Sequence, residues 1–180
     1  VYTKALELGL SETRATALGA LRIVDAANEW IYSRLDRDDT IWIQTSDNGG
    51  DPTQGASNYP LRGGKVSGWQ GGFQVPCFVW LGANLRGSLK EYAGLVYVTD
   101  WVPTIIGGAL GAPEALPADL YGQDLWESLR GNSAKAREDI LLMASYGTGD
   151  EAGEALVSLR TDRYKVCLLY TSDAADESVG

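Results

Sequence analysis

The sequence predicts an α/β fold, and two patterns near the amino-terminus carry that prediction. Apolar residues recur at three- and four-residue steps after Ser11, which indicates a long amphipathic helix. A short apolar run over residues 40–45 follows this helix and shows hardly any alternation. Such a run is typical of a strand buried on both faces, as in a parallel sheet covered by helices.

The predicted helix begins at Ser11, whose hydroxyl can cap the first turn, and continues to about Leu35. We expect one stripe of its side chains to face the sheet and its charged side chains to form a solvated face. The stripe consists of Leu18, Leu21, Val24, Asn28, Ile31 and Leu35.

Residues 46–72, after the strand, are rich in glycine and contain Pro52 and Pro60, so they are unsuited to regular elements. A loop of this length in a compact domain usually has a function. Residues 73–81 indicate a second buried strand. A further helix begins near residue 100, where Thr99 or Asp100 can cap it and Pro103 fits its first turn. Asp100 is also a candidate metal ligand, but the helix-start pattern after it favours capping.

Residues 107–117 are rich in Gly, Ala and Pro and predict a linker into a smaller unit. A short helix over residues 125–129 and strands over 140–143 and 155–166 predict a small antiparallel sheet with one helix. The sequence therefore predicts two domains. The first, over residues 1–110, is part of a main α/β domain, and the second, over 111–166, is a truncated α+β subdomain whose sheet ends in an open edge.

Residues 167–180 differ in kind from the rest of the chain. Cys167 to Glu177 back-translate into a nucleotide sequence that resembles a transposase-type sequencing adapter. We predict that this segment is adapter read-through and leave it out of the fold prediction. A natural acidic tail is the alternative, and longer sequencing reads across the junction would decide between them.

The composition sets outer limits on function. The net charge of -9 argues against nonspecific nucleic-acid binding and against a polybasic membrane face. The sequence contains no apolar run long enough to predict a membrane span. Two cysteines, Cys77 and Cys167, give no disulfide framework.

The strongest functional pattern lies at the end of the first predicted strand. Asp47 and Asn48 follow this strand, and Lys65 lies eighteen residues after Asp47. Parallel sheets bind ligands beyond the carboxyl ends of their strands. Carboxylate and amide oxygens are ligands that Ca²⁺ or Mg²⁺ prefers, although Ca²⁺ takes about six to eight oxygens, so others must contribute. The ammonium of Lys65 is suited to one oxygen of a tetrahedral anion.

Each of these residues also has a simpler interpretation. Asp-Asn-Gly-Gly is a common turn after a strand, and an isolated lysine is usually a solvated surface residue. The glycines around Lys65 do not form a nucleotide-binding P-loop, because Val66 replaces the required Ser or Thr and Tyr59 replaces the required Gly.

Several motifs, in order over roughly residues 15–166, resemble the sulfatase family, and most closely its arylsulfatase B-like members. They are Thr45-Ser46-Asp47-Asn48-Gly49-Gly50, residues 57–65 (SNYPLRGGK), Trp69-Gln70-Gly71-Gly72, Val75-Pro76, residues 98–104 (VTDWVPT) and residues 121–126 (YGQDLW). The resemblance implies part of an alkaline-phosphatase-like sandwich, a mostly parallel sheet flanked by helices.

The resemblance also implies roles for three residues. Asp47 and Asn48 are two ligands of a catalytic Ca²⁺, and Lys65 contacts the sulfate of a sulfated small molecule or glycan. The family's nucleophile is a formylglycine made from a cysteine or serine in a Cys/Ser-x-Pro/Ala-x-Arg motif. Neither Cys77 nor Cys167 fits that motif, and the chain has no histidine.

We therefore expect a carboxy-terminal fragment of a sulfatase that is inactive alone. The resemblance implies that the full-length parent protein resides in the periplasm, outside the cell or in the lysosome. Two alternatives stay open: a phosphatase or phosphodiesterase of the same architecture, and a non-catalytic calcium- or glycan-binding module. Of the tryptophans, Trp69 in the loop near Lys65 is the candidate for substrate contact, whereas Trp42, Trp80 and Trp101 are expected in the core.

Overall fold

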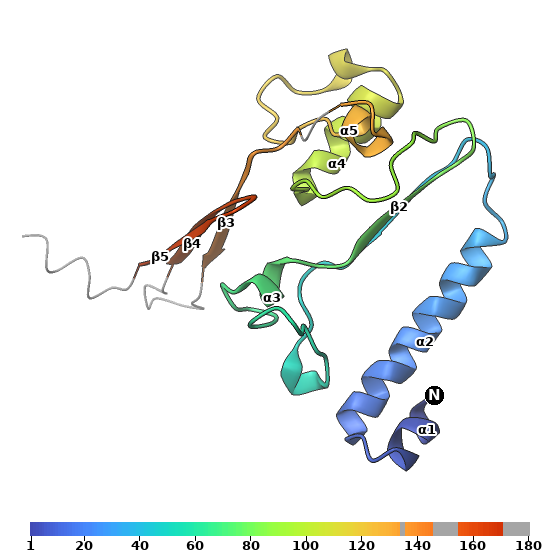
Figure 1. Ribbon diagram of the computed structural model, residues 1–180, viewed down its shortest axis with the longest axis vertical. Helices are drawn as coiled ribbons and strands as arrows, with labels where there is room; N and C mark the ends of the chain where they lie inside the picture. Colours follow the sequence, from blue (N-terminus) through green and yellow to red (C-terminus); the bar gives the residue numbers. More distant parts are fainter. Residues whose placement is uncertain (134–135, 146–154, 171–180) are drawn as a thin grey trace, which may run out of the picture. The chain divides into compact units, whose positions relative to one another are not determined.

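The computed structural model describes residues 1–133, 136–145 and 155–170 (Figure 1). Its contacts divide the chain into two compact units, Val1–Leu85 and Arg86–Gly180. Both units combine helices with strands, and both sheets in the described ranges are antiparallel. The predicted mixture of helix and strand is therefore confirmed, and the predicted sandwich stays a prediction. None of the described helices has the length and apolar character that crossing a bilayer requires.

The first unit begins with helices α1, Tyr2–Glu7, and α2, Glu12–Tyr32. Ser11 caps α2 as the sequence predicts, because its hydroxyl accepts a hydrogen bond from the Arg14 amide at 3.3 Å. The helix ends at Tyr32, short of the predicted end at Leu35. Beyond it the Asp36 carboxylate accepts the Asp38 amide at 2.9 Å, and this local turn competes with continued helix.

The predicted burial of one α2 stripe against the sheet is wrong in this structure. Leu21, Val24 and Ile31 of the stripe are all exposed. The last turn of the helix does reach the sheet, since the Tyr32 ring meets the Trp80 ring edge-on at 5.8 Å between centroids. The long helix therefore contributes few of the buried side chains of this unit.

Strand β1, Ile41–Thr45, pairs with strand β2, Cys77–Leu81, in antiparallel register from Ile41 opposite Leu81 to Thr45 opposite Cys77. The predicted parallel pairing is wrong for these strands. Parallel neighbours need a crossover connection, usually a helix, whereas residues 46–76 return the chain through a loop. Strand β2 also starts later than predicted, because Gln70–Phe73 forms the single helical turn α3.

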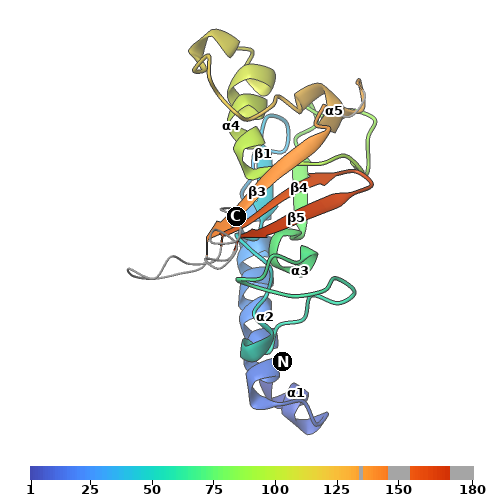
Figure 2. The same cartoon turned by 90° about the vertical axis from the view of Figure 1, so that its left-hand side faces the viewer.

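The second unit holds a short helical region and a three-stranded sheet. Its helical turns are η2, Val98–Asp100; α4, Trp101–Pro103; the π-helical η3, Thr104–Ala109; η4, Pro113–Ala115; and α5, Trp126–Arg130. The sheet has the order β3-β4-β5, with strands Asp139–Ser145, Ala155–Thr161 and Lys165–Tyr170, all antiparallel (Figure 2). The predicted small antiparallel sheet is confirmed, although the segment predicted as one strand, residues 155–166, forms β4 and the start of β5.

Two boundaries from the sequence stay predictions. The contacts divide the chain after Leu85, and the residues around 98–110 belong with the second unit, but this grouping does not decide where the native domains 1–110 and 111–166 separate. Strand β5 extends to Tyr170 and so includes the first residues of the segment predicted to be adapter read-through. Strand pairing does not reveal the origin of a sequence.

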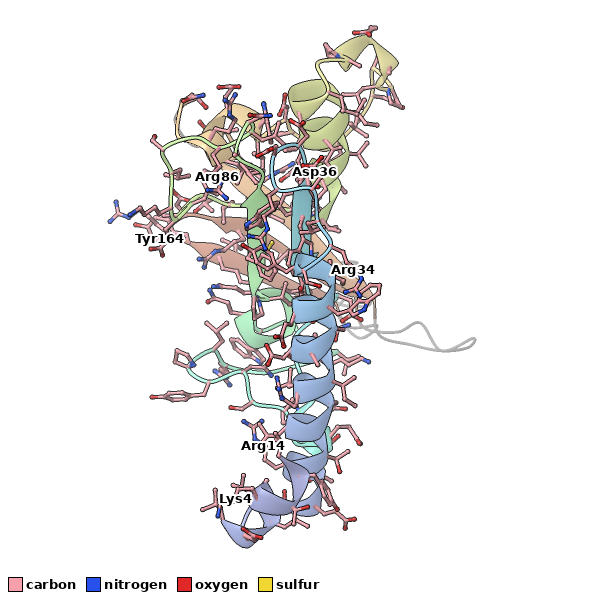
Figure 3. All side chains as sticks on the ribbon, turned by 90° about the vertical axis from the view of Figure 1, so that its right-hand side faces the viewer. Lys4, Arg14, Arg34, Asp36, Arg86 and Tyr164 are labelled. Atoms are coloured by element: carbon pink, nitrogen blue, oxygen red, sulfur yellow. The ribbon has the colours of Figure 1, made fainter. Side chains whose placement is uncertain are left out.

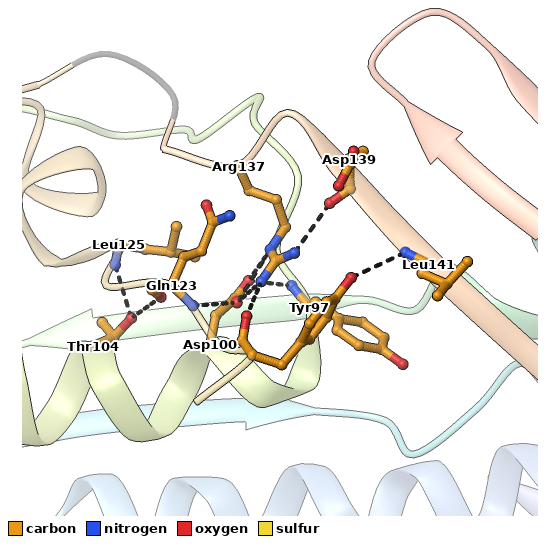
Figure 4. Close-up of polar contacts among 9 residues, drawn as sticks. Tyr97, Asp100, Thr104, Gln123, Leu125, Arg137, Asp139 and Leu141 are labelled. Atoms are coloured by element: carbon orange, nitrogen blue, oxygen red, sulfur yellow. Dashed lines mark hydrogen bonds and ion pairs between the residues drawn. The ribbon is translucent and has the colours of Figure 1, made fainter. Parts of the chain in front are cut away.

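The core of the second unit is built around a buried ion pair (Figure 4). Arg137 is 2% exposed and Asp100 is fully buried, and the guanidinium Nε donates to both carboxylate oxygens at 3.1 and 2.9 Å. The carboxylate also accepts the backbone amides of Tyr97 at 2.7 Å and Gln123 at 2.9 Å. Leu125, Trp126 and Ile140 are buried in the same unit.

These contacts confirm that Asp100 has a capping role, although it caps from the third position of η2 and not from the start of α4. Burial alone would lower the pKa of the Arg137 guanidinium. The hydrogen bonds and the charge of Asp100 outweigh burial, and the pKa of Arg137 lies above its ordinary value.

Candidate functional site

Asp47 and Asn48 lie in a tight turn directly after β1. The Asp47 Oδ1 atom accepts the Asn48 amide at 3.0 Å and the Ser46 hydroxyl at 3.4 Å, while the Ser46 hydroxyl also donates to the Asn48 carbonyl at 2.9 Å. Asp47 is exposed and Asn48 is half-buried. The turn interpretation is therefore correct, and it leaves a carboxylate at the surface with one oxygen oriented by the turn.

Glycine pairs let three segments of the loop pack backbone against backbone. The Gly49 amide donates to the Gly72 carbonyl at 2.9 Å, and a Cβ atom on Gly49 would lie only 1.7 Å from the carbonyl oxygen of Gly71. A Cβ atom on Gly64 would lie 2.6 Å from the carbonyl oxygen of Gly50. No other residue type would fit at these positions without moving the chain. The glycine-rich loop is thus compact and locally ordered around the end of β1.

Asn58 joins the two halves of this loop. Its Oδ1 atom accepts the Gly50 amide and its Nδ2 atom donates to the Gly50 carbonyl, both at 2.8 Å, so the side chain pairs with Gly50 as a neighbouring strand would. The same Nδ2 atom donates to the Gly63 carbonyl at 3.1 Å. Asn58 belongs to one of the motifs that resemble sulfatases, but the motif alone indicates no role for it. An asparagine amid glycines was the available signal.

Lys65 is brought to the same place through its backbone. Its amide donates to the Gly50 carbonyl at 3.2 Å, two residues beyond Asn48. The side chain is exposed, and within the described ranges its ammonium forms no hydrogen bond or ion pair. Its positive charge nevertheless reaches this loop. Hydrogen bonds from Thr53 lower the pKa of Asp51 most, and the charge of Lys65 lowers it further.

The structure therefore brings together the segments that carry Asp47, Asn48 and Lys65. Hydrogen bonds to the Gly50 peptide from Asn58 and Lys65 make this junction. That the three side chains converge on one pocket stays a prediction.

The oxygen ligands of this turn suit a hard cation, but they are too few to complete a metal site. Asp47 and Asn48 offer oxygens of the kind that Ca²⁺ takes. Among the described residues, no group of three or more His, Cys, Asp or Glu side chains is placed to hold a metal ion. Further ligands for a Ca²⁺ at this turn would have to come from other residues.

Arg14 ties this loop to helix α2. Its Nη1 atom donates to the Gly55 carbonyl at 2.7 Å, beside the 3-10 turn η1, Pro52–Gln54 (Figure 3). Within the loop, the Arg62 guanidinium lies 3.8 Å from the centre of the Trp69 ring. Trp69 is 49% exposed, as a residue in contact with substrate requires, but its role stays a prediction. Trp42, Trp80 and Trp101 are half-buried.

Comparison with known proteins gives the family. Residues 3–112 match the family model described as Sulfatase, and this segment contains the whole loop just described. The chain belongs to the sulfatase family. The resemblance found in the sequence is therefore confirmed at the level of the family.

Two curated relatives support this assignment. The chain is 43% identical over 104 residues to arylsulfatase J of Mus musculus, a match that covers 57% of this chain and 17% of the relative. It is 31% identical over 133 residues to steryl-sulfatase of Mus musculus, covering 68% of this chain and 20% of the relative. The matches thus span at most a fifth of the length of these relatives.

Two solved structures share the fold. Ps i-CgsB in complex with k-i-k-neocarrahexaose superposes with a TM-score of 0.64 at 22% identity, covering 94% of this chain and 41% of that one. A second structure of Ps i-CgsB gives a TM-score of 0.55 at 21% identity, covering 92% and 38%. At these identities the likeness concerns the fold alone.

Proposed function

We propose that this chain forms part of the active site of a sulfatase that hydrolyses sulfate esters. The observation that carries the proposal is the junction at Gly50, which joins the turn of Asp47 and Asn48 to the backbone of Lys65 within a matched sulfatase segment. The proposed activity is that of a longer protein that contains this chain, and the short share of the curated relatives that the matches span, a fifth or less, supports this.

Each of the three residues has a distinct role in this proposal. Asp47 and Asn48 would hold Ca²⁺, which when bound would neutralise charge on the oxygens of the sulfate group. Lys65 would hold one sulfate oxygen through its exposed ammonium and stabilise the negative charge that develops as the ester bond breaks. In this proposal, the formylglycine nucleophile and the remaining Ca²⁺ ligands would be residues of the longer protein that do not belong to the motifs found in this chain.

The substrate we propose is a sulfated small molecule or glycan. The exposure of Asp47, Lys65 and Trp69 suits a substrate that approaches from solvent. The names of the curated relatives refer to aryl and steryl substrates, and one structural neighbour is a complex with an oligosaccharide, k-i-k-neocarrahexaose. These names support a sulfate ester as the substrate, but they do not identify the alcohol that carries the sulfate.

The test compares two lysine variants in the longer protein recovered from the native locus. Lys65→Ala should lower turnover of p-nitrophenyl sulfate by about 10²- to 10³-fold, the loss typical when a group that stabilises developing charge is removed. Lys90→Ala is the control, because Lys90 is also exposed and lies in the other unit. Unchanged turnover with Lys65→Ala would show that Lys65 is a surface residue.

Two further measurements separate the competing functions. The same protein should hydrolyse p-nitrophenyl sulfate in preference to p-nitrophenyl phosphate, and the reverse preference would favour a phosphatase. The 180-residue chain alone should show no turnover above background, since the nucleophile would lie outside its motifs. Robust activity of this chain alone would contradict that expectation.

A further inference from the structure

A surface depression lies beside the junction just described. It has a volume of about 330 Å³ and is lined by residues 57–61 and 74–76, which belong to two segments of the first unit. One lining residue, Tyr59, is 91% exposed. An exposed aromatic ring that lines a depression offers a ligand a large, flat apolar face.

The backbone around Tyr59 is held in place. The Leu61 amide donates to the Asn58 carbonyl at 2.8 Å and closes a turn with Tyr59 and Pro60 at its tip. Asn58 in turn forms both hydrogen bonds to Gly50. The exposure of the ring is therefore a property of an anchored turn, which lowers the entropy cost of binding a ligand there.

The lining of the depression combines two kinds of surface. Tyr59, Leu61 and Val75 contribute apolar groups, and Ser57 and Gln74 contribute a hydroxyl and an amide. A pyranose ring has the matching character, because its C–H face is apolar and its hydroxyl groups lie at the ring edge. The Ser57 hydroxyl accepts the Tyr59 amide at 3.4 Å, and the Gln74 carbonyl oxygen accepts the Gln70 side-chain amide. A purely apolar aryl or steroid group would cover the remaining donors and acceptors of Ser57 and Gln74 without pairing them.

The depression and the candidate sulfate contact share one anchor. Asn58, which precedes Tyr59, bonds to the amide and the carbonyl of Gly50, and the Lys65 amide bonds to that same carbonyl at 3.2 Å. The backbone of Lys65 and the turn that carries Tyr59 therefore meet at the same peptide, and the proposal is that one substrate contacts both side chains.

We propose that the Tyr59 depression is a carbohydrate subsite, in which a pyranose ring of the substrate stacks on Tyr59. This inference rests on the proposed sulfatase function and narrows its substrate class to sulfated glycans. The subsite contributes affinity for the sugar, and Lys65 contributes affinity for the sulfate.

The experiment measures binding to the 180-residue chain by NMR titration and saturation transfer. The probes are a neutral galactan hexasaccharide, its sulfated counterpart and p-nitrophenyl sulfate. Tyr59→Ala should raise the Kd of both hexasaccharides by about 3- to 10-fold, the range for loss of one stacking contact, and Tyr59→Trp should restore it. Tyr164→Ala is the matched control, because Tyr164 is 67% exposed and lies in the other unit.

A second variant separates the two proposals. Lys65→Ala should weaken only the sulfated hexasaccharide and leave the neutral one unchanged. If Tyr59→Ala leaves both Kd values unchanged while Lys65→Ala weakens the sulfated probe, the subsite is refuted and the sulfatase proposal stands. If Tyr59→Ala weakens both probes and Lys65→Ala weakens neither, the subsite stands and the sulfate contact is refuted. The subsite would also be overturned if saturation transfer to p-nitrophenyl sulfate were lost in Tyr59→Ala while neither hexasaccharide received any transfer from the unsubstituted chain.

Discussion

Removal of the Arg137 side chain should strongly destabilise the second unit. Asp100 is fully buried and Arg137 is 2% exposed, so Arg137→Ala leaves a carboxylate without its counter-ion in the interior. Breaking a buried pair in this way costs about 3–5 kcal/mol. Asp100 keeps the amides of Tyr97 and Gln123 as hydrogen-bond donors, which places the expected cost near the lower end of that range.

The chain offers a matched control in another Arg–Asp pair. Arg22 and Asp25 form an ion pair on α2, but their side chains are 56% and 72% exposed. Exposed pairs of this kind contribute about 0–1 kcal/mol, so Arg22→Ala should have little effect. The two variants remove the same functional group and differ in burial.

Hydrogen exchange followed by mass spectrometry is the suitable assay, because it reports on each unit separately. The amides of Gln123 and Leu125 are bonded to the side chains of Asp100 and Thr104. In Arg137→Ala their exchange should accelerate by about 100-fold or more, the equivalent of roughly 3 kcal/mol. Exchange in the first unit should stay unchanged.

Two outcomes would contradict this role of the ion pair. If Arg137→Ala accelerates exchange no more than Arg22→Ala does, the buried ion pair does not stabilise the unit. The double variant Asp100→Asn with Arg137→Met removes both charges. Its loss of stability should be smaller than the sum of the losses of the two single variants, because each single variant leaves one buried charge unpaired and the double variant leaves none. Strict additivity would show that the two side chains act independently.

Further expected outcomes concern the loop of the candidate site. Gly49→Ala should speed proteolysis within residues 46–72, because the added Cβ atom would lie 1.7 Å from a carbonyl oxygen. Gly19→Ala in helix α2 is the control, because the added Cβ atom would have no neighbour nearer than 3.9 Å. It should leave cleavage unchanged and stabilise the helix by about 0.5–1 kcal/mol. Equal cleavage rates would contradict the close packing. Acid should loosen the wild-type loop more than an Asp51→Asn loop. The pKa of Asp51 lies below its ordinary value of 3.8, chiefly through the Thr53 hydroxyl, so its contribution is complete above that value and is lost as pH falls through the folded pKa. NMR titration from pH 5 to 2 checks this, and identical acid responses would refute it.

Local patterns determined much of what could be read from the chain alone. Ser11 caps a helix because its hydroxyl meets an amide three residues away, and Asp100 bonds to the Tyr97 amide for the same local reason. The ordered motifs around Asp47 and Lys65 indicated the sulfatase family before any contact was known, since family likeness resides in residue identity and spacing.

Contacts between distant segments were decided only by the tertiary structure. An apolar strand does not encode the direction of its neighbour, so the antiparallel pairing of β1 with β2 depends on how residues 46–76 return the chain. Arg137 lies 37 residues from Asp100, and nothing in either local sequence marks them as partners. The candidate site shows the same distinction. Its residue types are evident from the sequence, whereas the hydrogen bonds at the Gly50 peptide, which bring the segments of these residues together, form only in the folded loop.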